Sequence, residues 1–415
     1  MKKRDSQASA GLASNRRSFL KKGVAAAGAA TMGVGILNSP SRAFAAGHEG
    51  GNGRLNRGDA AILRFLQVLE SIESDIWRQY AELGGAGSNV PGTLGNSPVD
   101  LVFQGSPVPT ALAPLYLAGL QQLDGDMPQY INDNTDDEFS HMSFLAAYLE
   151  SKGEQVPDLT RFYDLTPSQV PGVPNTGRLT NLTQLTVDTS WWTRYRSDSK
   201  NPDLGDTFEN AIPTLAVGQH TAIPRTNQDL SADPNQPGGV SVHTQAIANT
   251  AGFHFAWIEQ GGSSLYPQLA QRATHSEVLR VLLSIGPSEV AHFQTWQDKA
   301  GNAIQLTDTD TGLPGSTGAT VTFPDLNSFK DPKVADEFQT NLIMPEPTFF
   351  LNKKFGPVSI IRPTETRNAA KAALQSFIDG GLFIGHTSKT GKSDGFVELL
   401  RELAEEADEA RREVE

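Results

Sequence analysis

The chain of 415 residues contains no cysteine, and this absence excludes several kinds of site at once. Disulfides, thiolate zinc sites and iron–sulfur clusters all require cysteine sulfur, and so does a lipid anchor on an N-terminal cysteine. Any bound metal must therefore be held by oxygen and imidazole ligands. Ligands of this kind suit iron and manganese, and they also accept zinc.

Basic residues are in the minority, with 34 Lys and Arg against 47 Asp and Glu, and the formal net charge is −13. A protein of this charge repels a polyanion, so we expect no nucleic-acid partner. The acidity favours solubility and concentrates cations near the protein. Its simplest interpretation is a solvated acidic surface.

Long apolar runs are missing as well, since the strongest one, residues 23–37, is shorter than the roughly 20 residues of a membrane-spanning helix. It follows the sequence NRRSFLKK at 15–22 and precedes AFA at 43–45. This arrangement resembles a twin-arginine export signal with a small-residue cleavage site. We therefore expect residues 1–45 to be removed and the mature protein to be periplasmic or secreted, without stable membrane insertion. An uncleaved membrane anchor is the alternative.

The most informative feature present is a pair of Glu-x-x-His tetrads, Glu138 with His141 and Glu289 with His292. Positions three apart lie on one face of a helix, so the carboxylate and the imidazole of a tetrad can bind the same pair of ions. One tetrad means little, but two in helical stretches indicate a dinuclear metal site. Two neighbouring cations also require one further Glu from each of two other helices.

The first predicted helix starts near Asp59 and covers residues 60–83, where apolar residues recur at steps of three, four or seven. Glu73 falls inside this apolar stripe, and Glu70 lies one turn earlier at its edge. A buried carboxylate needs a partner because an unpaired charge in a core costs several kcal/mol. Both acids are candidate ligands, and each could instead be a surface residue.

The second predicted helix covers residues 128–152 and ends before Gly153. Its tetrad comes one turn before the apolar stripe and on the same side. We expect the neighbouring acids Asp136 and Asp137 to face solvent or to favour the helix dipole in the first turn. The Gly- and Pro-rich connection before this helix, residues 84–126, is expected to hold one small helix.

Residues 154–240 form an insert rich in Pro, Asn, Asp, Thr and Ser, and it is too long for an ordinary loop. We predict a crossover connection that carries extra elements, with a functional lid as the alternative. Trp191 and Trp192 lie in its middle. Burial against the helices is the favoured interpretation of this pair, and an exposed binding surface is the other.

Glu259 is the only acid in the third predicted helix, residues 243–272, which makes it the candidate ligand of that helix. Gly261 and Gly262 follow it directly. Glycine lowers helix stability by about 1 kcal/mol relative to alanine, so a pair of glycines within a helix is unfavourable unless another interaction compensates. Two explanations are open for this pair, close packing against another helix and room for a ligand.

The fourth predicted helix opens at Thr274, which forms a capping box with Glu277. Gly286 and Pro287 interrupt it, because proline lacks the backbone donor that the helix needs. We therefore expect the second tetrad to begin a fresh helical segment. If the helix breaks there, Glu289 could be a first-turn acid instead of a ligand.

Residues 301–415 form a loop-rich C-terminal extension. A short alternating strand is predicted around 321–323, and helices are predicted at 365–380 and 395–415. The last helix is rich in charge. Such a helix is usually a solvated one, although it could pack on the others or bind a partner.

This order of elements, a helix with Glu, a helix with Glu-x-x-His, a long crossover and then the same pair again, resembles the ferritin-like superfamily of di-iron carboxylate proteins. The segments LESIE at 69–73 and EFSHMSFL at 138–145 look like those of exported, desiccation-related ferritin-like proteins. The resemblance covers residues 60–300 and does not explain the extension. It implies a mainly α fold, a ferritin-like four-helix bundle, whose metal ligands are Glu70 or Glu73, Glu138, His141, Glu259, Glu289 and His292.

The resemblance further implies two iron ions, with manganese as a substitute, and oxidase or ferroxidase chemistry with O2 or peroxide. We count a homo-oligomer among the expected assemblies. Two other functions stay open at this point. One is a non-catalytic protein that protects against stress or desiccation, and the other is a partner-binding module that uses the insert and the C-terminal region.

Overall fold

The computed structural model describes residues 53–87, 111–194, 207–326, 368–387 and 391–410. The chain divides into two units, Met1–Gly53 and Arg54–Glu415, and all the elements named below belong to the second. Eight α-helices and one two-stranded hairpin make up most of the described part, which confirms the predicted mainly α class. The predicted export signal lies outside the described residues. Within these ranges, no helix combines the length and the apolar character that crossing a bilayer requires.

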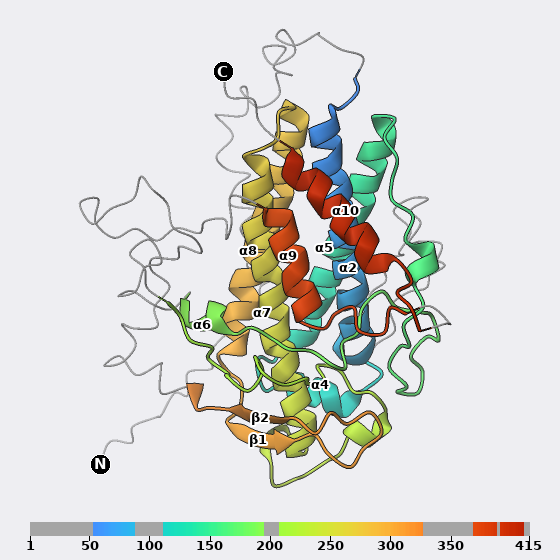
Figure 1. Ribbon diagram of the computed structural model, residues 1–415. Helices are drawn as coiled ribbons and strands as arrows, with labels where there is room; N and C mark the ends of the chain where they lie inside the picture. The colour runs from blue at the N-terminus through green and yellow to red at the C-terminus, as the bar shows by residue number, and fades with distance from the viewer. Residues whose placement is uncertain (1–52, 88–110, 195–206, 327–367, 388–390, 411–415) are drawn as a thin grey trace, which may run out of the picture. The chain divides into compact units, whose positions relative to one another are not determined.

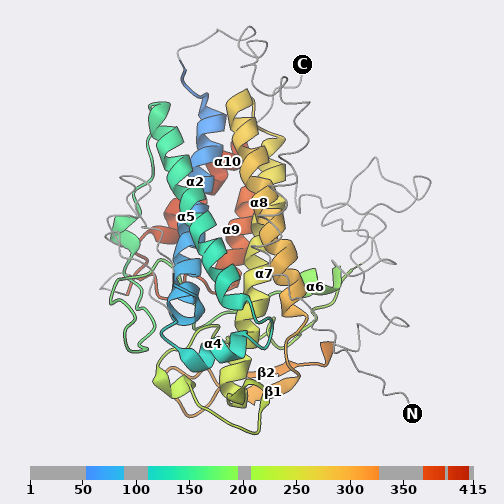
Figure 2. The same ribbon diagram turned by 180° about the vertical axis from the view of Figure 1, so that it is seen from behind.

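Four long helices lie side by side in Figures 1 and 2. They are α2 (Arg57–Gly84), α5 (Met127–Ser151), α7 (Val242–Ala270) and α8 (Ser276–Ala300). With 25 to 29 residues each, they are about 40 Å long. α2 packs mainly on α5, and α7 packs mainly on α8.

The two helices of the first pair are antiparallel. The backbone N–H of Ala86, just after α2, donates to the carbonyl of Pro128 at the start of α5 over 3.2 Å. At the other end, Arg64 near the start of α2 pairs with Glu154 just beyond α5 at 2.7 Å. A small helix, α4 (Pro114–Leu120), lies in the connection between them, as predicted.

The second pair is also antiparallel, because only residues 271–275 separate α7 from α8. Thr274 in this turn hydrogen-bonds to Asp59 at the start of α2. The end of α7 therefore lies beside the start of α2, so α7 runs in the same direction as α5. Residues 152–241 must consequently carry the chain back along the helices from the end of α5 to the start of α7.

The described parts of this connection, residues 152–194 and 207–241, hold short elements rather than long ones. They are α6 (Ser190–Arg194) and the 3-10 turns η1 (Thr160–Phe162), η3 (Asn227–Asp229) and η4 (Pro237–Gly239). Trp191 and Trp192 are both buried, and the Trp191 ring lies 5.7 Å from that of Phe253 and 6.0 Å from that of Phe293. The predicted burial of the tryptophan pair is therefore confirmed.

The start of α8 corrects one expectation. Its N-cap is His275, whose Nδ1 accepts from the backbone N–H of Glu277 over 3.2 Å, and the predicted capping box is wrong. The Thr274 hydroxyl instead donates to Asp59 Oδ2 over 2.6 Å. A carboxylate from another helix competes successfully for this hydroxyl, because a charged acceptor makes the stronger hydrogen bond.

The predicted break at Gly286 and Pro287 is also wrong, since α8 continues through Pro287. Proline removes the hydrogen bond to the carbonyl four residues earlier, which belongs to Leu283. Leu283 is 57% exposed and Pro287 is exposed too, so this loss falls on the solvent side of the helix. Glu289 therefore lies well inside a continuous helix and is not a first-turn acid.

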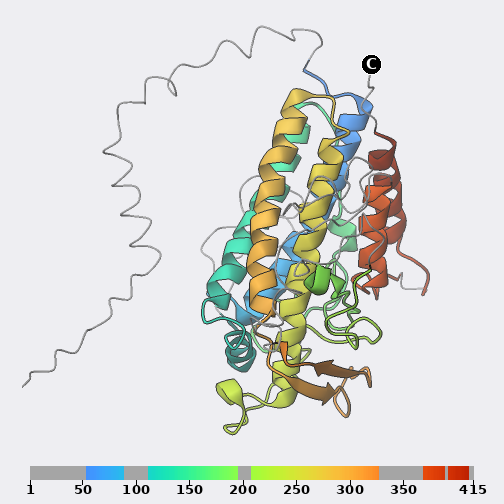
Figure 3. The same cartoon turned by 90° about the vertical axis from the view of Figure 1, so that its left-hand side faces the viewer.

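The C-terminal extension joins the same hydrophobic core. Strands β1 (Leu306–Thr309) and β2 (Thr320–Phe323) pair antiparallel. Helices α9 (Ala369–Asp379) and α10 (Phe396–Glu409) lie against α7 and α2, on the side away from α5 and α8 (Figures 1 and 3). Their buried apolar side chains include Leu374, Phe377, Leu400 and Leu403. The charge-rich last helix is thus packed along one face rather than fully solvated.

Candidate metal centre

The two tetrads face each other from α5 and α8. Helical spacing places Glu138 beside His141 on one helix and Glu289 beside His292 on the other. The centres of the two imidazole rings are 6.3 Å apart. Both glutamates are fully buried, and each histidine is 9% exposed.

A first group of ligands surrounds His141. Its Nδ1 lies 3.1 Å from Glu138 Oε2, 3.2 Å from Glu289 Oε1 and 3.4 Å from Glu70 Oε2. These contacts bring together side chains of α2, α5 and α8.

A second group surrounds His292. Its Nδ1 lies 3.2 Å from Glu138 Oε1 and 3.2 Å from Glu259 Oε2. Glu289 completes this group, which joins α5, α7 and α8.

The two groups share two carboxylates. Glu70, Glu138, His141 and Glu289 form one set, and Glu138, Glu259, Glu289 and His292 form the other. Within each set the ligand atoms all lie within 4.8 Å of one another, close enough to surround one ion. Since Glu138 and Glu289 belong to both sets, they are placed to bridge two neighbouring ions, and each ion would keep one Glu and one His of its own.

Position distinguishes the two candidate acids of the first helix. Glu70 belongs to the group around His141, whereas Glu73 belongs to neither group. Glu73 is only 4% exposed. Burial, followed by the charges of Glu289 and Glu70, raises the pKa of Glu73 well above its usual range.

Oxygens without a well-formed hydrogen bond show that the group fits metal ions. Both carboxylate oxygens of Glu289 and Oε2 of Glu70 are buried and make no hydrogen bond of good geometry in the described part of the chain, although His141 Nδ1 lies 3.2 Å from Glu289 Oε1 and 3.4 Å from Glu70 Oε2. A buried, unsatisfied carboxylate is costly, and a coordinated cation removes the cost. Two divalent cations would also balance the four negative charges of Glu70, Glu138, Glu259 and Glu289. Oxygen and imidazole donors in this arrangement suit iron or manganese.

The charges of the cluster change the proton affinity of its members. Burial raises the pKa of Glu70 to about 7, against the opposing effect of His141. Burial would also raise the pKa of Glu138, but hydrogen bonds from His141 and His292 outweigh it and lower that pKa. Burial disfavours both imidazolium ions, yet the surrounding carboxylates raise the pKa of both histidines well above the usual range. Metal binding through Nδ1 must therefore release protons.

Two aromatic residues and one amide support Glu259. Its Oε1 accepts from Trp77 Nε1 over 2.9 Å and from Asn134 Nδ2 over 2.8 Å. The side-chain oxygen of Asn134 in turn accepts from Trp296 Nε1 over 2.9 Å. No sequence motif predicts this role for these residues. The only local signal is that Asn134 precedes Glu138 by four positions, which places both on one helical face.

Asp137 is half-exposed, as one of its two expectations has it, and it also contacts the cluster. Its side chain is 51% exposed, but Oδ2 lies 3.0 Å from His292 Nε2, and it lies in the middle of α5 rather than in its first turn. A carboxylate on the far nitrogen fixes the orientation and the tautomer of a metal-binding histidine. Tyr266 fixes the orientation of the Glu70 carboxylate, because its hydroxyl donates to Glu70 Oε1.

Comparison of the chain with protein-family models, with curated proteins and with solved structures finds no match. The buried Glu and His cluster within a mainly helical protein is therefore the observation on which metal binding rests.

Proposed function

We propose that this chain is an exported, ferritin-like protein that holds a dinuclear iron or manganese centre and oxidises substrates, among them Fe(II), with O2 or peroxide. The observation that carries the proposal is the sharing of Glu138 and Glu289 between two ligand groups, in which buried oxygens of Glu289 and Glu70 make no hydrogen bond of good geometry within the described residues. A single-ion site does not require two shared carboxylates.

The course of the chain supports the family assignment within this proposal. The parallel direction of α5 and α7 and the long connection between them agree with the crossover expected of a ferritin-like bundle over residues 60–300. The sequence at 15–22 and 43–45 supports export through the twin-arginine pathway, with residues 1–45 as the signal. Residues 301–415 are the C-terminal extension of this scheme.

Two bound iron ions would supply one-electron oxidation and reduction steps toward O2 or peroxide. The residues of the chain prepare the site for this chemistry. His141 and His292 present Nδ1 to the ions, and Asp137 holds the outer nitrogen of His292. The donors on Glu259 and Glu70 limit the positions that these two carboxylates can take.

A structural metal in a protective protein is the second candidate. The near-complete burial of every ligand favours it as well, because a closed site is typical of structural metals. By contrast, a partner-binding surface at Trp191 and Trp192 loses its support, since both side chains are buried. An assay of turnover distinguishes an oxidase from a protective protein with a structural metal.

The first test is elemental analysis of the natively exported protein beside a Glu138→Ala/His292→Ala variant. Glu150→Ala is the matched control, because Glu150 is exposed on the same helix as Glu138. We expect about two iron or manganese ions per chain in the parent and in the control, and almost none in the double variant. A metal-free parent with an intact helical fold would exclude the proposed centre.

Oxygen consumption after addition of Fe(II) then distinguishes the two functions. Uptake that exceeds the rate of the double variant supports an oxidase. A rise in thermal stability with metal but without oxygen uptake supports a structural role.

A further inference from the structure

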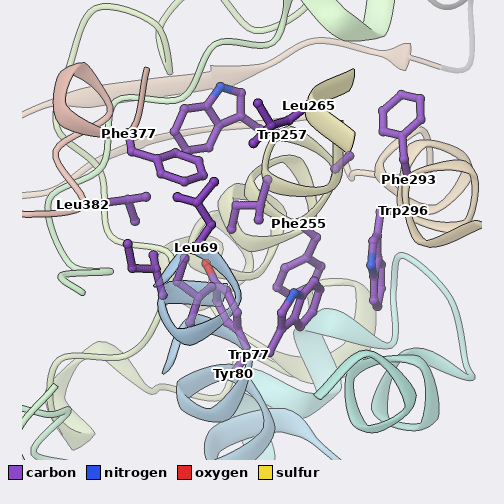
Figure 4. Packing of buried hydrophobic residues seen from close by; sticks show 14 of the residues in the cluster. Leu69, Trp77, Tyr80, Phe255, Trp257, Leu265, Phe293, Trp296, Phe377 and Leu382 are labelled. Carbon is purple, nitrogen blue, oxygen red and sulfur yellow. The ribbon is translucent and has the colours of Figure 1, made fainter. Parts of the chain in front are cut away.

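A small cavity lies beside the candidate centre, on the side of α2 and α7 that α9 covers. Its volume is about 50 Å³. Most of its wall is apolar and comes from three helices: Leu66 and Leu69 of α2, Trp257 and Leu265 of α7, and Phe377 of α9. Figure 4 shows Leu69, Trp257 and Phe377 close together, and the rings of the last two are 5.7 Å apart.

The size and the wall of this cavity restrict what it can bind. Apolar cavities in proteins accept apolar guests such as xenon, and the leucine, tryptophan and phenylalanine side chains of this wall offer such a guest van der Waals contact. The polar part of the wall comes from Glu70, Glu73, Gln260, Tyr266 and Ser376, so a water molecule is the competing occupant. An anionic guest would lose its hydration and face the carboxylates of Glu70 and Glu73. The cavity therefore suits a small, uncharged molecule.

The inner end of the cavity reaches the ligands of the candidate centre. Glu70 and Glu73 both line it, and Gly262 lines it beside Glu289. Glu70 Oε2 makes no hydrogen bond of good geometry within the described residues, where His141 Nδ1 lies 3.4 Å from it. A guest in this space would consequently lie next to a carboxylate that is placed to bind an ion.

The outer end is closed by the C-terminal extension. Ala373, Ser376 and Phe377 of α9 contribute to the wall, and Ser376 is exposed to solvent. The half-exposed Asp137 belongs to α5 and His292 belongs to α8, the two helices that lie in front of α9 in Figure 2. The apolar cavity beside Glu70 is thus separate from the exposed acidic residue beside His292.

We propose that this cavity is a binding site for one small, uncharged molecule of the size of dioxygen, which reaches the centre on the Glu70 side. α9 forms the wall that limits the size of the guest. The binding site follows from the cavity alone, whereas the delivery of dioxygen as an oxidant rests on the proposed function.

Xenon is a suitable probe because it is apolar, similar in size and independent of metal. Binding is measured on the mature full-length chain, freed of metal with a chelator, by 129Xe NMR or in crystals under xenon pressure. Ala373→Leu fills the cavity from α9, and Ala372→Leu is its control, since Ala372 is exposed on the same helix. We expect xenon beside Leu69 in the parent and in the control, and its loss in Ala373→Leu.

Absence of xenon from the parent cavity, or unchanged binding in Ala373→Leu, would overturn the proposal. Circular dichroism and thermal unfolding show whether each variant is folded. If Ala373→Leu fails to fold, Leu66→Phe fills the same space from α2 and must also remove xenon.

Each of the two proposals, the metal centre and the cavity site, can be refuted without refuting the other. Xenon binding without metal in the exported protein refutes the proposed centre but leaves the cavity as a binding site. Two metal ions without xenon refute the cavity and leave the centre. If both stand, Ala373→Leu should raise the KM for dioxygen several-fold in the iron-loaded protein with little change in kcat, as expected when a binding step alone is weakened.

Discussion

Gly262 of α7 lies so close to Glu289 of α8 that the Cβ of any other residue would be 2.7 Å from Glu289 Oε2. No such contact exists at Gly261, where an added Cβ would meet nothing within 4 Å. The glycine pair thus contains one position that the shared carboxylate requires and one that it does not. A side chain at Gly262 would require the Glu289 carboxylate to shift, whereas a side chain at Gly261 would not.

Gly262→Ala should displace Glu289 and weaken metal binding by about tenfold or more, as the loss of support around a metal ligand does. Gly261→Ala is the matched control and should bind metal as the parent does. Both variants gain about 1 kcal/mol of helix propensity, so neither should unfold. Isothermal titration with Mn(II) measures the affinities, and equal affinities in the two variants would refute the role of Gly262.

Asp137→Asn removes the negative charge that faces His292 Nε2. Loss of such an outer partner typically lowers metal affinity by about 10- to 100-fold. Asp133→Asn is the control, since Asp133 is exposed on the same helix. Competition with a fluorescent chelator measures both affinities. A parental affinity in Asp137→Asn would show that Asp137 only solvates the surface.

Asn134→Ala leaves Trp296 Nε1 without its acceptor and removes one of the two donors to Glu259 Oε1. A buried group left unsatisfied costs about 1–3 kcal/mol, so the metal-free protein should lose about that much stability. Gln129→Ala, at an exposed position of α5, should cost far less. Urea unfolding of the parent and of both variants measures the free energy of unfolding. Similar losses in both variants would contradict the assigned contacts.

His243 should make the stability depend on pH above neutrality. Its Nδ1 lies 2.8 Å from Asp308 and its Nε2 lies 3.2 Å from Asp229. Burial lowers the pKa of His243, but these carboxylates outweigh burial and raise it to about 9. The usual value is 6.5, so this stabilisation is complete below about pH 6.5 and disappears as the pH rises through about 9.

The size of this step is smaller than the about 3.4 kcal/mol that a pKa change from 6.5 to about 9 represents, because solvent screens the partly exposed pairs, and His243→Gln should abolish it. The free energy of unfolding, measured in urea between pH 6 and pH 10 with chelator present, gives the two curves. Their difference separates His243 from other groups that titrate in the same range, Glu70 among them. A constant difference across this range would exclude the assigned ion pairs.

Much of the helical architecture could be predicted because its signals are local. The apolar periodicity indicated α2, α5, α7 and α8 to within a few residues, and the spacing of three placed Glu138 beside His141. The two errors at α8 arose where distant residues or solvent decided the outcome. Thr274 found Asp59 instead of its own helix, and the exposed side of α8 tolerated Pro287.

The sequence by itself determined the kinds of ligand, their placement on helical faces and the exclusion of sulfur sites, because composition and helical spacing need no tertiary information. Only the tertiary structure decided that Glu70 rather than Glu73 joins the ligand groups and that Glu138 and Glu289 are shared. It also decided that α9 closes a cavity beside them. These features depend on which helical faces lie opposite one another, and that is set by the packing of side chains far apart in the chain.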